Sequence, residues 1–160
     1  MALEITDLLR LLDESFGKTA WHGTTLRGAL RGLDCKQASW RPKPGRHNIW
    51  EIVLHAAYWK YAVRRRITGG KRGSFAYHGN NWFIRPGKTR SDSWERDISI
   101  LEEENRLLRE VVAALPPERL SEPSARKKWT LAQMIAGIAF HDVYHAGQIQ
   151  LLKRLQGRDS

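Results

Sequence analysis

The sequence predicts an all-α protein: a four-helix bundle whose first helix is broken and whose second and third helices are joined by a long connection. Four stretches carry apolar residues at intervals of three and four, the spacing of one helix face. Two of these stretches begin with a capping pattern, and prolines or glycines separate all four. The length of 160 residues suits one domain, which we expect to span residues 1–160.

The first helix is expected over residues 4–16, where apolar side chains form one stripe. The chain then reaches Gly17 and Gly23, which break the pattern. Apolar residues return at helical spacing over residues 26–33, so a second helical piece is expected there. The later segment RPKPGRH contains two prolines and a glycine and is expected to be a loop.

The second helix of the bundle is expected to begin after Asn48. Asn48 and Glu51 form a capping-box pattern, with an Asx residue at the N-cap and Glu three residues later. The inward stripe of this helix consists of Ile52, His55, Trp59 and Ala62. We therefore expect the His55 side chain to point into the core.

A long, glycine-rich connection follows over residues 69–91. Short aromatic runs flank Gly79, Asn80 and Asn81, so a short hairpin is one interpretation and an extended crossover is the other. Connections of this length are frequently lids or binding loops.

The third helix is expected to begin near Asp92 or Ser93 and to end at Pro116 and Pro117. Its apolar residues follow one inner face, and the glutamates at 102–104 are expected on the outer face.

The fourth helix is expected to begin at Thr130, which forms a second capping box with Gln133. His141 and His145 lie four residues apart on its apolar side, so their imidazoles share one helix face. With His55 they offer three neutral imidazoles, the commonest protein ligands for a transition metal, and leave one coordination position open. We predict one divalent transition metal, zinc or nickel, in the bundle core; the alternative is three ordinary helical histidines.

Glu51 and Gln148 are the candidates for a catalytic or supporting role at such a site. Glu51 lies one turn before His55 and could orient its imidazole, or it could serve only as the capping partner of Asn48. Gln148 lies three residues after His145 and could line the pocket as a hydrogen-bonding group.

The remaining histidines and the single cysteine are expected outside the site. His22 lies at a helix break, and His47 and His78 are expected to be exposed. Cys35 is expected to pack as a small apolar side chain, and Asp142 is expected to flank the metal site without facing it. Packing is also expected for the tryptophans at positions 40, 50, 59 and 129.

Basic residues are concentrated in one segment. The net charge is +10, and residues 41–90 contain twelve of the 27 Lys and Arg residues but a single acid, Glu51. The segment is a solvated face, a nucleic-acid surface, or an entrance that attracts an acidic ligand. No nucleic-acid-binding motif accompanies the charge, so we do not favour nucleic acid, although the segment leaves it open. For an acidic ligand, some of the bases among Lys43, Arg46 and residues 64–66 would frame the entrance.

The cysteine and hydropathy patterns lead us to expect a cytoplasmic protein with no membrane segment. With Cys35 as the only cysteine, no intrachain disulfide can form, which suits a reducing compartment. No run of 18 apolar residues occurs, and the first residues are acidic where a signal peptide would be basic.

The chain resembles the DinB superfamily over essentially its whole length. NIWEIVLHAAYW is similar to the family pattern xIxEIxxHxxxW, and HDVYHAGQI is similar to the pattern HxxxHxGQI of the last helix. The segment AWHG and the loop WRPKPG also resemble a branch of this family. The resemblance implies a four-helix bundle in which His55, His141 and His145 hold one divalent metal.

The family includes transferases that use a low-molecular-weight thiol, bacillithiol or mycothiol, and proteins described as metal-dependent hydrolases. The resemblance therefore implies a metal-dependent enzyme of the thiol S-transferase or hydrolase type, acting on a small-molecule substrate. It also implies a homodimer. The alternative is a non-catalytic module that binds a metal or, through its basic segment, nucleic acid.

Overall fold

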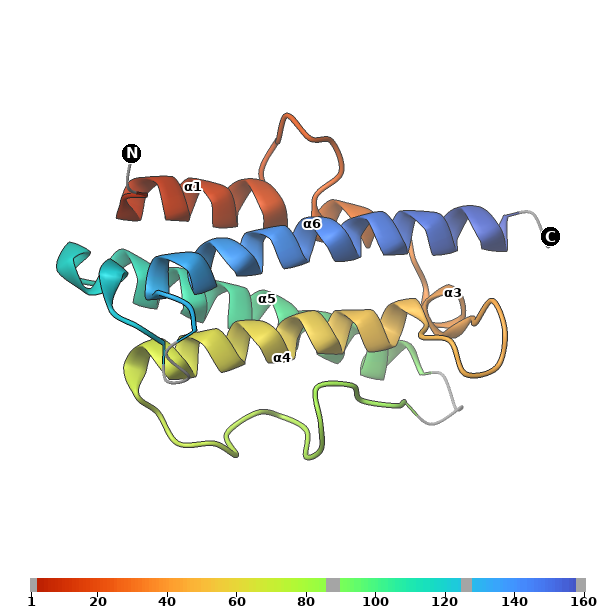
Figure 1. Ribbon diagram of the computed structural model, residues 1–160. Coiled ribbons are helices and arrows are strands. Elements are labelled where there is room, and N and C mark those ends of the chain that lie inside the picture. The colour runs from red at the N-terminus through yellow and green to blue at the C-terminus, as the bar shows by residue number, and fades with distance from the viewer. Residues whose placement is uncertain (1–2, 86–89, 125–127, 158–160) are drawn as a thin grey trace.

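The computed structural model describes residues 3–85, 90–124 and 128–157, and four long helices packed side by side dominate it (Figure 1). These helices are α1 (Ile5–Phe16), α4 (Ile49–Thr68), α5 (Ser91–Ala113) and α6 (Leu131–Gln156). The connections contain α2 (Leu26–Ala29), α3 (Cys35–Ser39) and the 3-10 helix η1 (Pro117–Ser121). No strand occurs within the described ranges, so the predicted all-α bundle is confirmed.

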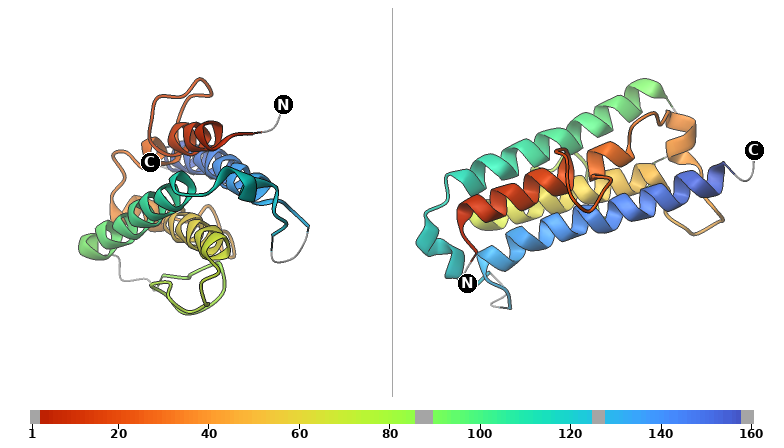
Figure 2. Two further views of the ribbon diagram at one scale, coloured as in Figure 1. Left: turned by 90° about the vertical axis from the view of Figure 1, so that its left-hand side faces the viewer. Right: turned by 90° about the horizontal axis from the view of Figure 1, so that it is seen from above.

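Each long helix packs against two neighbours, in the cyclic order α1, α6, α4, α5. The left view of Figure 2 looks roughly along the helix axes and shows this four-cornered arrangement. The core consists of two apolar clusters. The first half of α6, up to Ile138, packs in one cluster, and its second half, from Ala146 onward, packs in the other. The histidines of α6 therefore lie between two apolar clusters. No described helix is long and apolar enough to cross a membrane.

The predicted helix starts are confirmed where a side chain caps the backbone. The Asn48 side chain accepts the backbone N–H of Glu51 at 2.8 Å, and α4 ends at Gly69, whose φ of 72° is left-handed. At the start of α6, Thr130 and Gln133 exchange both hydrogen bonds of a capping box. Local hydrogen bonds thus define both ends of α4 and the start of α6.

The break after α1 differs from the expectation. The helical piece expected over residues 26–33 is limited to the four residues of α2, and a further short helix, α3, follows. Asp34 caps α3 in a capping box with Gln37, a pattern that is visible in the sequence but was not part of the prediction.

The hairpin interpretation of residues 69–91 is wrong for the described part of that segment, which runs along α4 without forming strands (Figure 1). Its aromatic side chains pack singly onto the helices, and Phe75 and Phe83 are buried. Because these aromatic side chains are buried against the helices, the segment is held without side-chain pairs between two strands. Residues 86–89 lie outside the described ranges.

Asp97 of α5 holds this connection in place. Its buried carboxylate accepts hydrogen bonds from Trp50 Nε1 at 2.7 Å and from the Tyr77 hydroxyl at 2.5 Å, and Arg85 Nε lies 3.1 Å away. The Arg85 guanidinium also lies over the Trp50 and Tyr77 rings. The connection is therefore fastened to α4 and α5 on both sides of residues 78–84.

The expectation that all of residues 102–104 lie on the outer face is wrong for Glu104. Its side chain is buried and forms an ion pair with Arg64 of α4 at 2.8 Å. The ion pair satisfies the carboxylate at a position where an apolar residue would be expected.

A buried ion pair joins α4 to α6. Lys60 Nζ and the Asp142 carboxylate form a hydrogen bond, and the two side chains are 1% and 0% exposed. As expected, Asp142 flanks the histidines and points to another partner. Because neither charge reaches water, each depends on the other.

Replacing Asp142 with Ala would leave the Lys60 ammonium buried without a partner, so we expect the free energy of unfolding to fall by about 3–5 kcal/mol. The double change Lys60→Met and Asp142→Leu removes both charges and should recover most of that loss. Urea unfolding followed by circular dichroism measures both effects. The surface variant Arg106→Ala, whose ion pairs are exposed, serves as a control with an expected change below about 1 kcal/mol. Equal losses in the single and double variants would contradict the prediction.

Candidate metal centre

Three imidazoles meet between α4 and α6. His141 Nε2 lies 3.3 Å from His55 Nε2 and 3.0 Å from His145 Nε2. Each residue offers one ligand atom, and the three atoms lie within 4.8 Å of one another. The structure thus brings together the three histidines that the sequence singled out.

Hydrogen bonds behind the rings orient two of the imidazoles. His55 Nδ1 lies 2.7 Å from the Asn81 carbonyl oxygen, which can only accept, so Nδ1 carries the proton and Nε2 of the neutral ring has a free lone pair. His145 Nδ1 likewise donates to Gln148 Oε1 at 2.7 Å, and Gln148 Nε2 donates to the Tyr144 hydroxyl. Partners of this kind fix the tautomer of metal-binding histidines. Gln148 therefore supports the site, as the sequence suggested.

The separations fit a metal held by Nε2 atoms. Tetrahedral coordination at about 2.0–2.1 Å places ligand nitrogens about 3.3 Å apart, close to the two measured separations. Without a metal, the neutral His141 ring can carry its proton on Nε2 and donate it to His145 or His55. His141 Nδ1 is buried and has no hydrogen-bond partner in the described part of the chain, so this proton could move to Nδ1 without breaking another hydrogen bond and leave Nε2 to a metal. The cluster therefore could hold a metal.

Burial keeps the three histidines neutral. It lowers the pKa of His55 to about 4 and that of His141 to about 3, and the positive charge of nearby protonated groups would add to both shifts. Burial also lowers the pKa of His145, against the hydrogen bond to Gln148. Neutral imidazole is the form that a metal requires, so at neutral pH no proton has to be displaced.

Trp82 forms one wall of the site. Its indole stacks on the His55 ring with a centroid distance of 3.8 Å, and His47 stacks on its other face at 3.6 Å. Trp82 and Asn81 both belong to the long connection, so this segment holds His55 in place. Sequence reasoning missed both residues; the length of the connection was the only signal that it had a function.

Glu51 does not contact His55, which has its own partner in Asn81. The Glu51 carboxylate accepts hydrogen bonds from Arg41 and, at 2.9 Å, from His47 Nδ1. The capping box is thus only half formed, because the Asn48 backbone is not bonded to this carboxylate. Burial would raise the pKa of Glu51, but the hydrogen bonds from Arg41 and His47 hold it below its ordinary value.

A cavity of about 780 Å³ opens onto the three histidines between the loop at 41–47, α4 and the second half of α6. His47 lines it, which differs from the expectation of a merely exposed residue. Its lining also includes Lys43, Arg46, Trp82, Tyr144, Gln148 and Leu151. His22 and His78 are exposed and do not line it.

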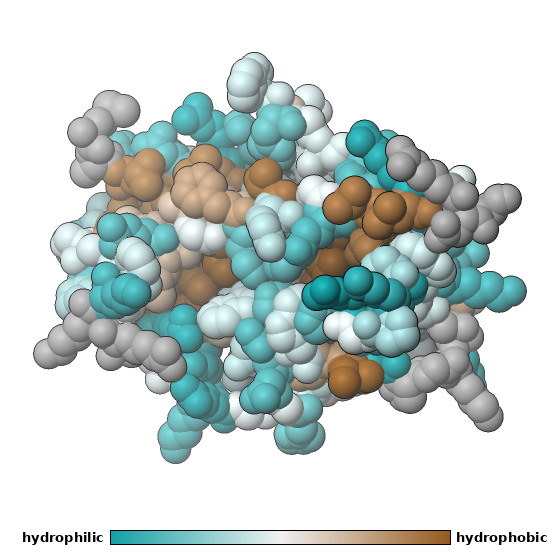
Figure 3. Space-filling model, turned by 45° about the vertical axis from the view of Figure 1, so that its right-hand side comes forward, coloured by the Kyte–Doolittle hydropathy of each residue, from teal (hydrophilic) through white to brown (hydrophobic). Residues whose placement is uncertain are grey.

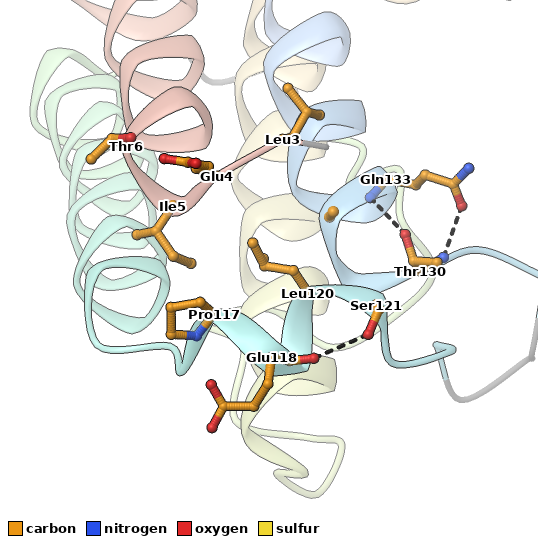
Figure 4. A pocket seen from close by; sticks show the side chains of 11 residues that line it. Leu3, Glu4, Ile5, Thr6, Pro117, Glu118, Leu120, Ser121, Thr130 and Gln133 are labelled. Carbon is orange, nitrogen blue, oxygen red and sulfur yellow. Dashed lines mark hydrogen bonds between the residues drawn. The ribbon is translucent and has the colours of Figure 1, made fainter. Parts of the chain in front are cut away.

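Two further cavities lie elsewhere on the bundle. One reaches His141 from the other side and is lined by Trp59, Arg66 and Phe140. Another lies at the end of the bundle, where α1, η1 and α6 meet, and Figure 4 shows it with Leu3, Ile5, Pro117 and Leu120 around it. The first of these is lined by His141 but by neither His55 nor His145, and the second is lined by no histidine. Of the three cavities, the one between the 41–47 loop and α6 combines the whole histidine cluster with charged groups.

Much of the basic segment is neutralised within the fold. Five of its bases form ion pairs with carboxylates. The pairs are Arg41–Glu51, Lys60–Asp142, Arg64–Glu104, Arg85–Asp97 and Arg90–Asp92. The sequence excess of bases therefore overstates the charge that a partner would meet.

Comparison with known families agrees with the geometry. The family model of the DinB superfamily matches residues 18–149, which include all three histidines. The chain belongs to the DinB superfamily. No curated protein and no solved structure matches the chain. For this DinB-family protein the match supports the helical fold and the position of the histidine cluster, and it leaves the activity open.

The histidine pKa values predict how the stability of the metal-free protein depends on pH. Between pH 7 and 5 the unfolded histidines, with pKa near 6.5, take up protons, while native His55 and His141 stay neutral. Proton uptake therefore stabilises the unfolded state relative to the native state. The free energy of unfolding should fall by about 2 kcal/mol for each of these histidines. Urea unfolding at both pH values, with chelator present, measures the loss. The His55→Gln/His141→Gln variant should show a smaller loss, and His78→Gln should behave like wild type. Equal losses in all three proteins would contradict the assignment.

Proposed function

We propose that this DinB-family protein binds one divalent transition metal ion through His55, His141 and His145 and acts as a metal-dependent enzyme. The observation that carries the proposal is the convergence of three neutral Nε2 atoms, two of them oriented by Asn81 and Gln148. Three protein ligands leave a position open for a reactant, as in catalytic metal sites. The adjoining cavity supplies room for a small molecule.

The bound ion would supply Lewis acidity, which promotes loss of a proton from a water or a thiol beside it. We propose zinc or nickel, because both accept imidazole ligands. The residues of the chain hold the reactant: Trp82 and Tyr144 form walls, and Gln148 keeps His145 in position. Transfer of a low-molecular-weight thiol and hydrolysis are the two reactions that this arrangement supports.

The cavity supports an enzyme better than it supports a nucleic-acid-binding module. Five bases of the 41–90 segment are neutralised by ion pairs, and the free bases Lys43 and Arg46 line the cavity. Nucleic acid binding relies on a continuous row of free cations. The open coordination position also argues against a purely structural metal.

Metal content tests the proposal directly. We expect about one equivalent of metal in wild type and less than about a tenth of that in His141→Ala, since two imidazoles bind far more weakly than three. The matched control His78→Ala changes an exposed histidine outside the cluster and should retain wild-type metal content. Elemental analysis after dialysis against zinc or nickel, with circular dichroism to verify folding, gives the answer. Equal metal content in wild type and His141→Ala would exclude the site.

We also propose that the protein is a homodimer that pairs through α6. This helix exposes Phe140, Tyr144 and Leu151 by 64%, 63% and 58%, at the three-to-four spacing of one face. Figure 3 shows apolar surface in two areas of one side of the molecule, separated by polar side chains. Exposed apolar stripes of this kind mark interaction sites.

Sedimentation equilibrium at micromolar concentration should show a dimer for wild type. The variant Phe140→Asp/Leu151→Asp places two charges on the stripe and should be monomeric. Trp21→Asp changes an exposed aromatic residue in another part of the chain and should remain dimeric. A dimer that survives the Phe140→Asp/Leu151→Asp change would place the interface elsewhere, and a monomeric wild type would remove the proposal.

A further inference from the structure

The cavity beside the three histidines has one cationic side. Lys43 and Arg46, from the loop before α4, line it and form no ion pair within the described residues. Among the described residues, no Asp or Glu side chain lines this cavity. Free cations in a cavity without acids produce a positive potential that attracts an anion.

The Glu51 carboxylate, which binds His47 of the cavity lining, is not paired with Lys43 or Arg46. Glu51 is 1% exposed, and its carboxylate is already bonded to Arg41 and His47. His47 is held by that bond and by stacking on Trp82. Because Nδ1 faces Glu51, Nε2 of His47 remains for a ligand, and no hydrogen bond to it occurs in the described part of the chain.

Apolar side chains also line the cavity. They are Leu151, Leu152 and Leu155 of α6 and Ile52 of α4. Leu155 is partly exposed and lies outside the stripe proposed for the dimer interface, so its apolar surface is available to a ligand. From His141 to Leu155 the wall follows α6 for about 20 Å, given a rise of 1.5 Å per residue. The cavity therefore suits an elongated molecule, not a compact ion.

Lys43 and Arg46 together can hold one carboxylate group. Arginine pairs with a carboxylate through two parallel hydrogen bonds, and a lysine adds one point charge. A phosphate dianion is usually bound by a helix N-terminus or a nest of backbone N–H groups as well. At the start of α4, the Asn48 side chain already occupies one of these groups, the N–H of Glu51. A carboxylate is thus the better match.

We propose that this cavity binds a small organic carboxylate with an apolar body, and that this is the substrate class of the site. The carboxylate contacts Lys43 and Arg46, and the body lies along Leu152 and Leu155. The remaining end of the molecule reaches the three histidines. Only this last contact rests on the proposed metal-dependent function, because the cationic and apolar sides need no metal.

Octanoate is the probe, with acetate and 1-octanol as matched controls for the charge and the apolar body. Isothermal titration calorimetry with wild type should show octanoate binding at least about tenfold more tightly than either control. The variant Lys43→Gln/Arg46→Gln should lose about tenfold in octanoate affinity and leave 1-octanol unaffected. Leu155→Ser should weaken both. The control Lys71→Gln/Arg72→Gln changes two bases outside this cavity and should bind octanoate like wild type.

Titrations of metal-loaded and chelator-treated protein separate this proposal from the metal site. A chain that binds no metal but still loses octanoate affinity in the Lys43→Gln/Arg46→Gln variant would retain the carboxylate site and reject the metal function. Unchanged octanoate affinity in that variant would overturn the carboxylate site, whatever the metal content. Acetate or inorganic phosphate binding as tightly as octanoate would also overturn it, in favour of a general anion site. Displacement of octanoate by a short DNA duplex at lower concentration would overturn it in favour of nucleic acid.

Discussion

The contact between Lys60 and Asp142 is the constraint on which the arrangement of α4 and α6 depends. The two side chains are almost completely buried, so neither charge can be satisfied by water. Lys60 lies five residues after His55, and Asp142 follows His141 directly. A shift of one helix along the other would separate the two charges as well as the imidazoles. The ion pair therefore fixes the register at which His55 meets His141 and His145.

The site also depends on a segment that belongs to neither helix. Asp97 binds Tyr77 and Arg85, and the residues between them include Asn81 and Trp82. Asn81 orients the His55 imidazole, and Trp82 covers its face. A carboxylate on α5 thus helps to position a histidine on α4 through a connection whose described part contains no helix or strand. The connection is long enough to contact both α5 and the histidine cluster.

The charge of the chain is divided between two uses. Some bases of the 41–90 segment offset carboxylates that would otherwise be buried without a partner, as Arg64 does for Glu104 and Arg41 for Glu51. Others, such as Lys43 and Arg46, line a cavity to which no described Asp or Glu contributes. Net charge alone cannot separate these uses, since the same residue types serve both. Only the positions of the carboxylates distinguish a structural base from one that a ligand can meet.

The sequence by itself determined the features that depend on near neighbours in the chain. The starts of α4 and α6 follow from the capping residues Asn48 and Thr130, and the pair His141 and His145 follows from helical spacing. The inward stripe of the second helix added His55 as the third member, and the resemblance to the DinB superfamily implies the same three residues. Only the tertiary structure decided which partners surround these histidines. Glu51 faces Arg41 and His47 in place of His55. Of the two interpretations of residues 69–91, the structure has the extended connection, which places Asn81 and Trp82 beside His55. The sequence offers several possible hydrogen-bond partners to a side chain such as Glu51 or His55. Packing between distant segments decides which of these partners it contacts.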